Sequence, residues 1–447
     1  MNVFPRVRLP LSCVIGILAG ETLLSAEPSA PTAGLERFYI GTYSGAIYQA
    51  TLDLGTGAMG MVSKAATIGD PSFVALAPNR NFVYAVNEGG GTVGAFSVNP
   101  TNGVLKLLNQ RSSNGGAPAH VVVDRSGRTV IVANYNGGNA TVFPLLTNGM
   151  LGAATAHVQH PGPNPLAHCI TLDAANRFAF VTDKGLDQIR SYHFDSVAGT
   201  LVTNNPPFVA VAKGSGPRHL TFEPQYKRAY VICELSSTII GFDYNGTNGV
   251  LASFQTVSTL PPGGLGGVNT AAEIVVHPSG KFVYGSNRGK DSIAVFTVDP
   301  ANGMLTPVQQ QATGRTPRNF AIDPTGAFCF VAGQNSNDVR LYRIDPRTGF
   351  LTDTGNKLAV SAPVCIVPFI LQSPQPILAT RATGDHTSEL TIANSLAVLT
   401  YQLFETTQLP AQDQWNLLAT GEPGQTNFLL TNALPQEFFQ VRVSTNY

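Results

Sequence analysis

Charged side chains are scarce in this sequence. Asp, Glu, Lys and Arg make up 12% of the 447 residues, about half of the roughly 25% that is typical of soluble proteins. The 27 basic and 27 acidic residues cancel, so the formal net charge is zero. Such a chain has no global field that would attract nucleic acid or an anionic membrane surface. We therefore expect a small-molecule partner bound at a local site, no nucleic-acid partner, and a monomeric protein.

Cysteine is also rare, and the spacing of the five cysteines matches no known disulfide or metal-binding pattern. There is no CxxC pair and no His cluster at metal-ligand spacing, which argues against a zinc site or a disulfide-rich scaffold. Four of the five lie in predicted strands: Cys169, Cys233, Cys329 and Cys365. We expect them to be small buried thiols, with a disulfide between two of them as an open alternative, and we expect neither metal nor cofactor.

No hydrophobic run is long enough to span a bilayer. The apolar stretch Leu9–Gly20 follows Arg6 and Arg8 and ends shortly before the small residues around Ala26. This order is typical of a secretory signal. We expect residues 1–26 to be a signal peptide and the protein to be secreted or periplasmic, without a membrane span. The alternative is a frayed apolar terminus on a cytosolic protein.

The dominant feature of the chain is a repeat built from short β-rich runs. Each copy opens with Pro or Ala, reaches a turn six residues later, and ends its second run with a polar residue at position sixteen or seventeen. Six copies occur, 46 to 54 residues apart, and they open at Pro71, Pro118, Ala167, Pro217, Ala271 and Pro317. Such a period is typical of propellers and solenoids.

A seventh copy is divided between the two ends of the repeat region. Pro363 opens a run without the rest of its unit, and Arg37–Gly57 supplies the missing later strands. Seven four-stranded units, the last closed by both ends, predict an all-β, seven-bladed β-propeller over residues 37–370. We expect Val364–Val367 to pair beside Arg37–Thr42, which would remove the open sheet edges that invite aggregation.

The pattern changes after the propeller. Residues 371–387 contain no repeat frame and are interpreted as a linker. Residues 388–447 offer several more strands and the only Trp. We expect a small C-terminal β-sandwich-like module with an accessory or attachment role.

Two positions of the repeat frame are expected to form a ring at one mouth of the channel. The residue after the opening Pro or Ala and the residue seventeen positions along come back side by side in a hairpin, and the first strand of each blade lines the channel. The first position holds Ser72, Ala119, His168, Arg218, Ala272 and Arg318, and the second holds Glu88, Tyr135, Lys184, Glu234, Arg288 and Gln334. This is a concentration of charge in a chain that has little.

Several stretches resemble a known family. HCITLDAANRFAFVTDKGLD, SGPRHLTFEP, VICELSSTI, AAEIVVHPSGKFVYGSNR and PRNFAIDPTGAFCFVAGQ are similar to the lactonase-type seven-bladed propellers. That family includes bacterial 6-phosphogluconolactonase and the fungal 3-carboxy-cis,cis-muconate lactonising enzyme. The resemblance covers roughly residues 37 to 370.

The resemblance implies a metal-free catalytic set, which falls on His168, Arg218, Glu234 and Arg288. Family members often have a second His two residues before His168, where this chain has Leu166. Further polar residues of the ring are expected to bind substrate: Asn134, Asp183, Asn287 and Arg318. Three other histidines are expected to be structural: His120, His219 and His277.

These residue types suit the opening of a lactone. His168, or else Glu234, would activate water, and Arg218 or Arg288 would stabilise the charge on the carbonyl oxygen or hold an anionic group. The sequence therefore predicts a secreted lactonase that hydrolyses a sugar-type lactone or a related organic acid lactone. Two alternatives are a non-catalytic ligand- or protein-binding propeller and a metal-dependent gluconolactonase-type propeller. The second is disfavoured, because no carboxylate–amide metal cage stands out.

Overall fold

A computed structural model describes residues 34–264 and 267–370, and six further strands between residues 377 and 444. Every regular element in these segments is a β-strand. No helix in the described part of the chain is long and apolar enough to cross a membrane. Residues 1–26, for which a signal peptide is predicted, lie outside the described residues.

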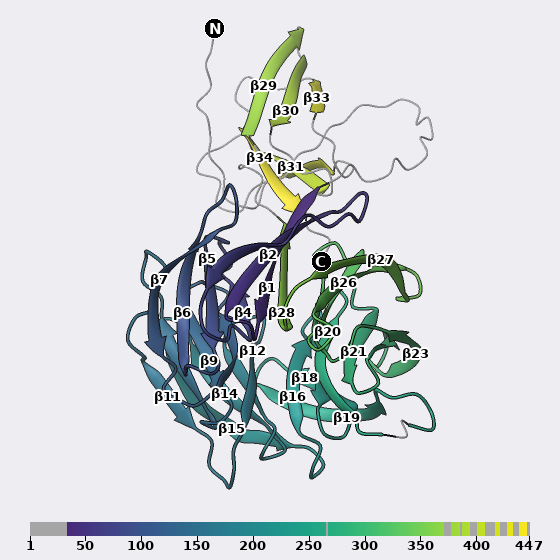
Figure 1. Ribbon diagram of the computed structural model, residues 1–447. Helices are drawn as coiled ribbons and strands as arrows, with labels where there is room; N and C mark the ends of the chain where they lie inside the picture. Colours follow the sequence, from purple (N-terminus) through teal and green to yellow (C-terminus); the bar gives the residue numbers. More distant parts are fainter. Residues whose placement is uncertain are drawn as a thin grey trace. The chain divides into compact units, whose positions relative to one another are not determined.

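Residues 37–369 contain seven four-stranded sheets, as the repeat predicts (Figure 1). Blade 1 consists of β28 (Pro363–Ile370), β1 (Leu35–Thr42), β2 (Ala46–Asp53) and β3 (Ser63–Thr67). Blade 2 consists of β4 (Val74–Leu76), β5 (Phe82–Asn87), β6 (Thr92–Val98) and β7 (Leu105–Ser112). Blade 3 consists of β8 (Pro118–Val123), β9 (Thr129–Asn134), β10 (Asn139–Pro144) and β11 (Ala156–Gln159).

The remaining four blades follow in sequence order. Blade 4 consists of β12 (Ala167–Leu172), β13 (Phe178–Asp183), β14 (Gln188–Asp195) and β15 (Thr200–Ala210). Blade 5 consists of β16 (Pro217–Phe222), β17 (Arg228–Cys233), β18 (Thr238–Asn245) and β19 (Val250–Ser258). Blade 6 consists of β20 (Thr270–Val276), β21 (Phe282–Arg288), β22 (Ser292–Val298) and β23 (Leu305–Ala312). Blade 7 consists of β24 (Pro317–Ile322), β25 (Phe328–Gly333), β26 (Asp338–Ile344) and β27 (Leu351–Ala359).

Blade 1 confirms the predicted closure of the ring. Its strand order is β28-β1-β2-β3, so the last strand of the propeller pairs with the first (Figure 1). The rings of Tyr39 on β1 and Phe369 on β28 stack with centroids 5.2 Å apart. Both residues are buried. The two ends of the propeller are thus joined by backbone pairing and by apolar contact.

Carboxylates at the sixth frame position close the first hairpin of several blades. Asp124 accepts hydrogen bonds from the backbone N–H groups of Arg128 and Thr129, each at 2.6 Å. Asp173 does the same in blade 4, where its partners are the N–H groups of Arg177 and Phe178. A short polar side chain that satisfies turn N–H groups fixes the turn and therefore the register of the strands it joins.

Glycine turns tie each blade to its neighbour. Gly149 has φ = 82°, and a Cβ placed there would lie 2.2 Å from the ring of Phe82 in the preceding blade. Its carbonyl accepts a hydrogen bond from the hydroxyl of Tyr84 at 3.0 Å. Only glycine satisfies both the left-handed backbone and the close approach. The same hydroxyl-to-glycine bond recurs from Tyr39 to Gly103, Tyr230 to Gly303 and Tyr284 to Gly349.

The hydrophobic core lies between blades. One cluster joins Phe180 of blade 4 to Phe222, Phe242 and Val231 of blade 5, and similar clusters join blades 2 and 3, 3 and 4, 5 and 6, and 6 and 7. Because each sheet buries its faces against its neighbours, no blade forms its core alone.

The C-terminal segment forms two three-stranded sheets. One has the order β29-β30-β33 and the other β32-β31-β34. Their bounds are β29 Ile377–Gly384, β30 Thr387–Ala393, β31 Thr400–Thr406, β32 Asn416–Thr420, β33 Asn427–Thr431 and β34 Phe438–Ser444. β29 lies within residues 371–387, which were predicted to be a linker. Its sequence, ILATRATG, contains no repeat frame, which is why a linker was expected there.

Removing β28 should open the ring. We expect a chain that ends at Val360 to expose the edge of β1 and to aggregate, whereas a chain that ends at Ile370 keeps β28 and stays soluble. Size-exclusion chromatography and thermal melting of the two truncations test this. Equal solubility and equal melting temperatures would show that the closing strand is dispensable.

Candidate functional site

In blades 3 to 7, the residue after the opening Pro or Ala lies at an irregularity of the innermost strand pair. In blade 5, Pro217 is opposite Cys233 and His219 is opposite Ile232, so Arg218 is an extra residue. The same shift occurs at Ala119, His168 and Arg318, and blade 6 has a longer one at Ala272 and Glu273. β-bulges re-aim side chains next to functional sites. As a result, residues one and two positions after the opening residue line the same pocket.

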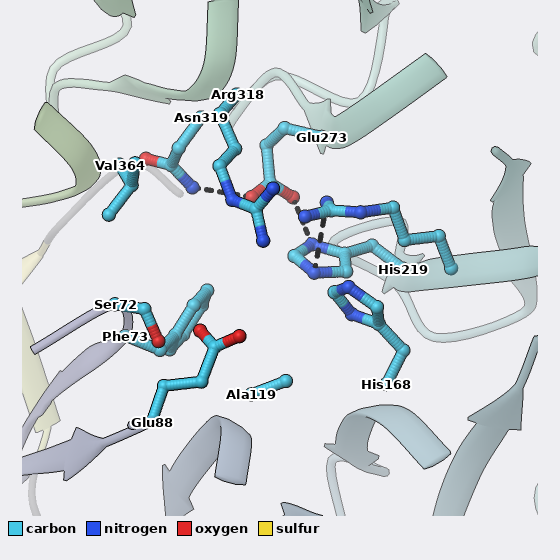
Figure 2. Close-up of a pocket in the computed structure, with 11 residues that line it drawn as sticks. Ser72, Phe73, Glu88, Ala119, His168, His219, Glu273, Arg318, Asn319 and Val364 are labelled. Atoms are coloured by element: carbon cyan, nitrogen blue, oxygen red, sulfur yellow. Dashed lines mark hydrogen bonds and ion pairs between the residues drawn. The ribbon is translucent and has the colours of Figure 1, made fainter. Parts of the chain in front are cut away.

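That pocket contains about 240 Å³ of space between its side chains, part of it open to solvent (Figure 2). It is lined by Ser72, Phe73, Glu88, Ala119, His168, Arg218, His219, Glu273, Arg318, Asn319 and Val364.

Glu234 gathers three cations beside this pocket. Its Oε1 accepts a hydrogen bond from Nζ of Lys184 at 2.6 Å. Its Oε2 lies 3.1 Å from Nε of Arg218 and 3.1 Å from Nη2 of Arg288. Three of the four residues expected to be catalytic are thus in one ion-pair group. Lys184 is a member to which the sequence assigned no role, although it occupies a ring position.

The ion pairs determine the ionisation of the group. Burial acts to raise the pKa of Glu234, but Arg218, Arg288 and Lys184 outweigh it and lower the pKa to about 2. Burial, with the neighbouring Arg288 and Arg318, lowers the pKa of Arg218 to about 10. Both groups therefore remain charged at neutral pH. Glu234 and Arg288 do not line the pocket, whereas Arg218 does.

His168 lines the same pocket from β12. It is 5% exposed, and its Nδ1 has no hydrogen-bond partner among the described residues. Burial, followed by the charge of Arg218, holds its pKa well below the usual value of 6.5. The imidazole is therefore neutral at pH 7, in the form that can accept a proton.

A buried chain of hydrogen bonds supports Arg218 from below. Nη1 of Arg218 donates to the carbonyl oxygen of Ala272 at 2.6 Å and lies 3.2 Å from Nε2 of His219. Nδ1 of His219 is 2.7 Å from Oε1 of Glu273. Because a carboxylate only accepts, Nδ1 carries the proton and Nε2 is free to accept from the guanidinium. Burial keeps the pKa of His219 below its usual value, although Glu273 opposes this.

The chain continues across two more blades. Nδ2 of Asn319 donates to Oε2 of Glu273, and Oδ1 of Asn319 accepts from the backbone N–H of Ile366 on β28 (Figure 2). His219 was expected to be structural, but it lines the pocket and positions Arg218. Glu273 and Asn319 were missed altogether. They lie two residues after the opening Ala271 and Pro317. A regular strand would turn this position away from the channel, and the bulges turn it toward the pocket.

Arg318 faces the pocket from β24. Its Cζ lies 5.3 Å from the centre of the Tyr43 ring. No carboxylate lies within ion-pair distance of it among the described residues. Of the four residues expected to bind substrate, it is the one that lines the pocket.

The other three have structural partners. Asn134 donates to the carbonyl oxygen of Ser113, and Asn287 donates to that of Thr259. Asp183 is 2.6 Å from Nδ1 of His160 and accepts from three backbone N–H groups. All three side chains are fully buried. Their frame position, sixteen, pairs with the opening residue of the strand and points into the blade, so we leave them out of the proposed site.

The remaining expectations concern buried groups. His277 bonds the carbonyl oxygen of Gly326 at 2.9 Å, which is a structural contact, and His120 packs on Phe73 with centroids 3.9 Å apart. The four cysteines of the described region are free and buried. Within that region no group of three or more His, Cys, Asp or Glu side chains is placed to hold a metal ion.

The charge on Glu234 should make stability depend on pH. The folded-state pKa of about 2 lies below the ordinary 4.5, so the stabilisation is present above pH 4.5 and is lost as the pH falls toward 2. Between pH 6 and pH 3 the free energy of unfolding of the parent should fall by about 2 kcal/mol more than that of Glu234→Gln. Chemical denaturation of both proteins at the two pH values measures this. Identical losses would mean that Glu234 is not held ionised by its neighbours.

Known proteins support the lactonase resemblance. The family model described as lactonase, 7-bladed beta-propeller, matches residues 37–368. The 6-phosphogluconolactonase of Bacillus subtilis is 34% identical over 296 residues, which are 63% of this chain and 83% of that protein. A putative 6-phosphogluconolactonase from Bacteroides fragilis superimposes with a TM-score of 0.70 at 32% identity, covering 77% of this chain and all of that one. The Pseudomonas aeruginosa periplasmic gluconolactonase gives 0.71 at 29% identity, covering 76% and 100%. This chain belongs to the lactonase family of seven-bladed β-propellers.

Proposed function

We propose that this protein is a lactonase that hydrolyses the ring ester of a sugar-type lactone, as the names of its relatives indicate for them. The observation that carries the proposal is a neutral, buried His168 with an unpartnered Nδ1 in the same pocket as the Arg218 guanidinium. A base beside a cation is what hydrolysis of an ester requires, because one activates water and the other stabilises the oxyanion.

The reaction follows from these positions. As a water oxygen attacks the lactone carbonyl carbon, its proton passes to His168. The carbonyl oxygen becomes negatively charged, and the buried guanidinium of Arg218 stabilises it. When the ring C–O bond breaks, the imidazolium returns the proton to the leaving alkoxide, and the product is an open hydroxy acid. Atoms and charge balance without any further reactant.

Glu234 acts in this proposal as a positioning residue and not as the base. A carboxylate with a pKa of about 2 holds protons too weakly to be an efficient base near neutral pH. Its two oxygens are also occupied by Lys184, Arg218 and Arg288. It keeps the guanidinium of Arg218 in place, and Arg288 pairs with the same carboxylate oxygen.

Replacing His168 tests the assignment of the base. We expect His168→Ala to lower kcat by about a hundredfold or more, with the matched control His193→Ala, an exposed histidine on β14, unchanged. Because the base must be unprotonated and the pKa of His168 is depressed, activity of the parent should persist below pH 6.5 and fall only at lower pH. The assays should contain a chelator. A His168→Ala protein with parental kcat, or an acid limb above pH 6.5, would remove His168 from this role.

We also propose that the protein is exported, on the strength of the signal-like residues 1–26 and a periplasmic relative. Mass spectrometry of protein from fractionated cells is expected to find a mature N-terminus near Glu27 outside the cytoplasm. Full-length protein confined to the cytoplasm would rule export out.

A further inference from the structure

The pocket has a second wall that the proposed reaction does not use. The base and the cations come from blades 4, 5 and 7, on β12, β16 and β24. Ser72 and Glu88 come from blade 2 and line the pocket as well. Figure 2 shows Glu88 extending into the space from the wall that carries Ser72 and Phe73, with His168 and His219 on another side.

Glu88 differs from the other two carboxylates of the site. The oxygens of Glu234 are occupied by cations, and those of Glu273 by His219 and Asn319. Among the described residues, Glu88 has no ion pair; its single hydrogen-bond donor is the hydroxyl of Tyr43, at 2.8 Å from Oε2. Tyr43 fixes the carboxylate, and Oε1 remains available to a ligand.

Ser72 provides an independent observation. It is 5% exposed, and its Oγ has no hydrogen-bond partner among the described residues. A buried hydroxyl without a partner costs free energy and needs an explanation. Because Ser72 lines the pocket, a ligand hydroxyl in that pocket is the partner that would satisfy it.

We propose that Ser72 and Glu88 form a hydroxyl-binding subsite that selects polyhydroxylated lactones over lactones without hydroxyl groups. Each oxygen of the Glu88 carboxylate can accept a hydrogen bond from a ring hydroxyl, while Ser72 can donate one and accept another. A site built to bind hydroxyl groups discriminates strongly against an analogue that lacks them, since its own polar groups are then left unpaired. This proposal rests on the lactonase function and assigns its substrate specificity to blade 2.

The test compares D-glucono-1,5-lactone with δ-valerolactone, which has the same ring without the hydroxyls. We expect Ser72→Ala and Glu88→Gln each to lower the ratio of kcat/KM for the first lactone over the second by about tenfold or more. The change should lie mainly in KM, because the lost contact holds substrate and transition state alike. Ser63→Ala, an exposed serine on β3, is the matched control and should leave the ratio at its parental value. Ser72→Ala removes a hydroxyl without a protein partner, so it is also the variant that retains the fold.

Two outcomes would overturn the subsite. Equal losses on both lactones would place Glu88 in the chemistry of ester hydrolysis, and an unchanged ratio in both variants would place hydroxyl recognition elsewhere. If the parent hydrolyses neither lactone, the proposed function fails, and the subsite is judged by calorimetry with D-gluconate and hexanoate. A preference of the parent for gluconate that Ser72→Ala abolishes would support the subsite, and no such preference would refute it.

Discussion

Closure of the ring is the constraint on which the rest of this structure depends. Each blade buries its faces against its neighbours, so the hydrophobic clusters lie between sheets and not within them. A chain of such units has two unprotected ends unless the last strand returns to the first. Here β28 pairs with β1, and the rings of Tyr39 and Phe369 stack between these two strands. The same closure delivers Ile366 to Asn319, and so completes the buried chain beneath Arg218.

The site concentrates charge in a protein that has little. Four cations and three carboxylates lie around the channel. Burying a charged group without a partner of opposite charge costs free energy. Glu234 is such a partner for Lys184, Arg218 and Arg288 at once. The result is a fixed, charged wall beside a neutral histidine. Burial and then the charge of Arg218 lower the pKa of His168, so its imidazole stays unprotonated at neutral pH.

The bulge after the opening residue of the inner strand allows one blade to place two neighbouring side chains in the pocket. In a regular strand, neighbouring residues face opposite sides. The bulge turns two consecutive positions toward the channel, so blade 5 contributes both Arg218 and His219. One residue stabilises charge and the next one holds it in place. Blade 7 contributes Arg318 and Asn319 to the pocket in the same way.

The sequence by itself determined the propeller, its seven blades, the closing strand and the ring positions of His168, Arg218, Glu234 and Arg288. These features follow from a repeat. Its turns and apolar runs are formed by residues that are close together in the sequence, so the sequence alone shows them. Only the tertiary structure shows that Glu273 and Asn319 line the pocket and that Asn134, Asp183 and Asn287 do not. A one-residue irregularity reverses the direction of a side chain, and no local pattern marked it. Nor could spacing reveal that Glu234 pairs with three cations while Glu88 has no ion pair among the described residues. Ion pairing depends on the tertiary fold, which brings together residues as far apart in the chain as Lys184, Glu234 and Arg288.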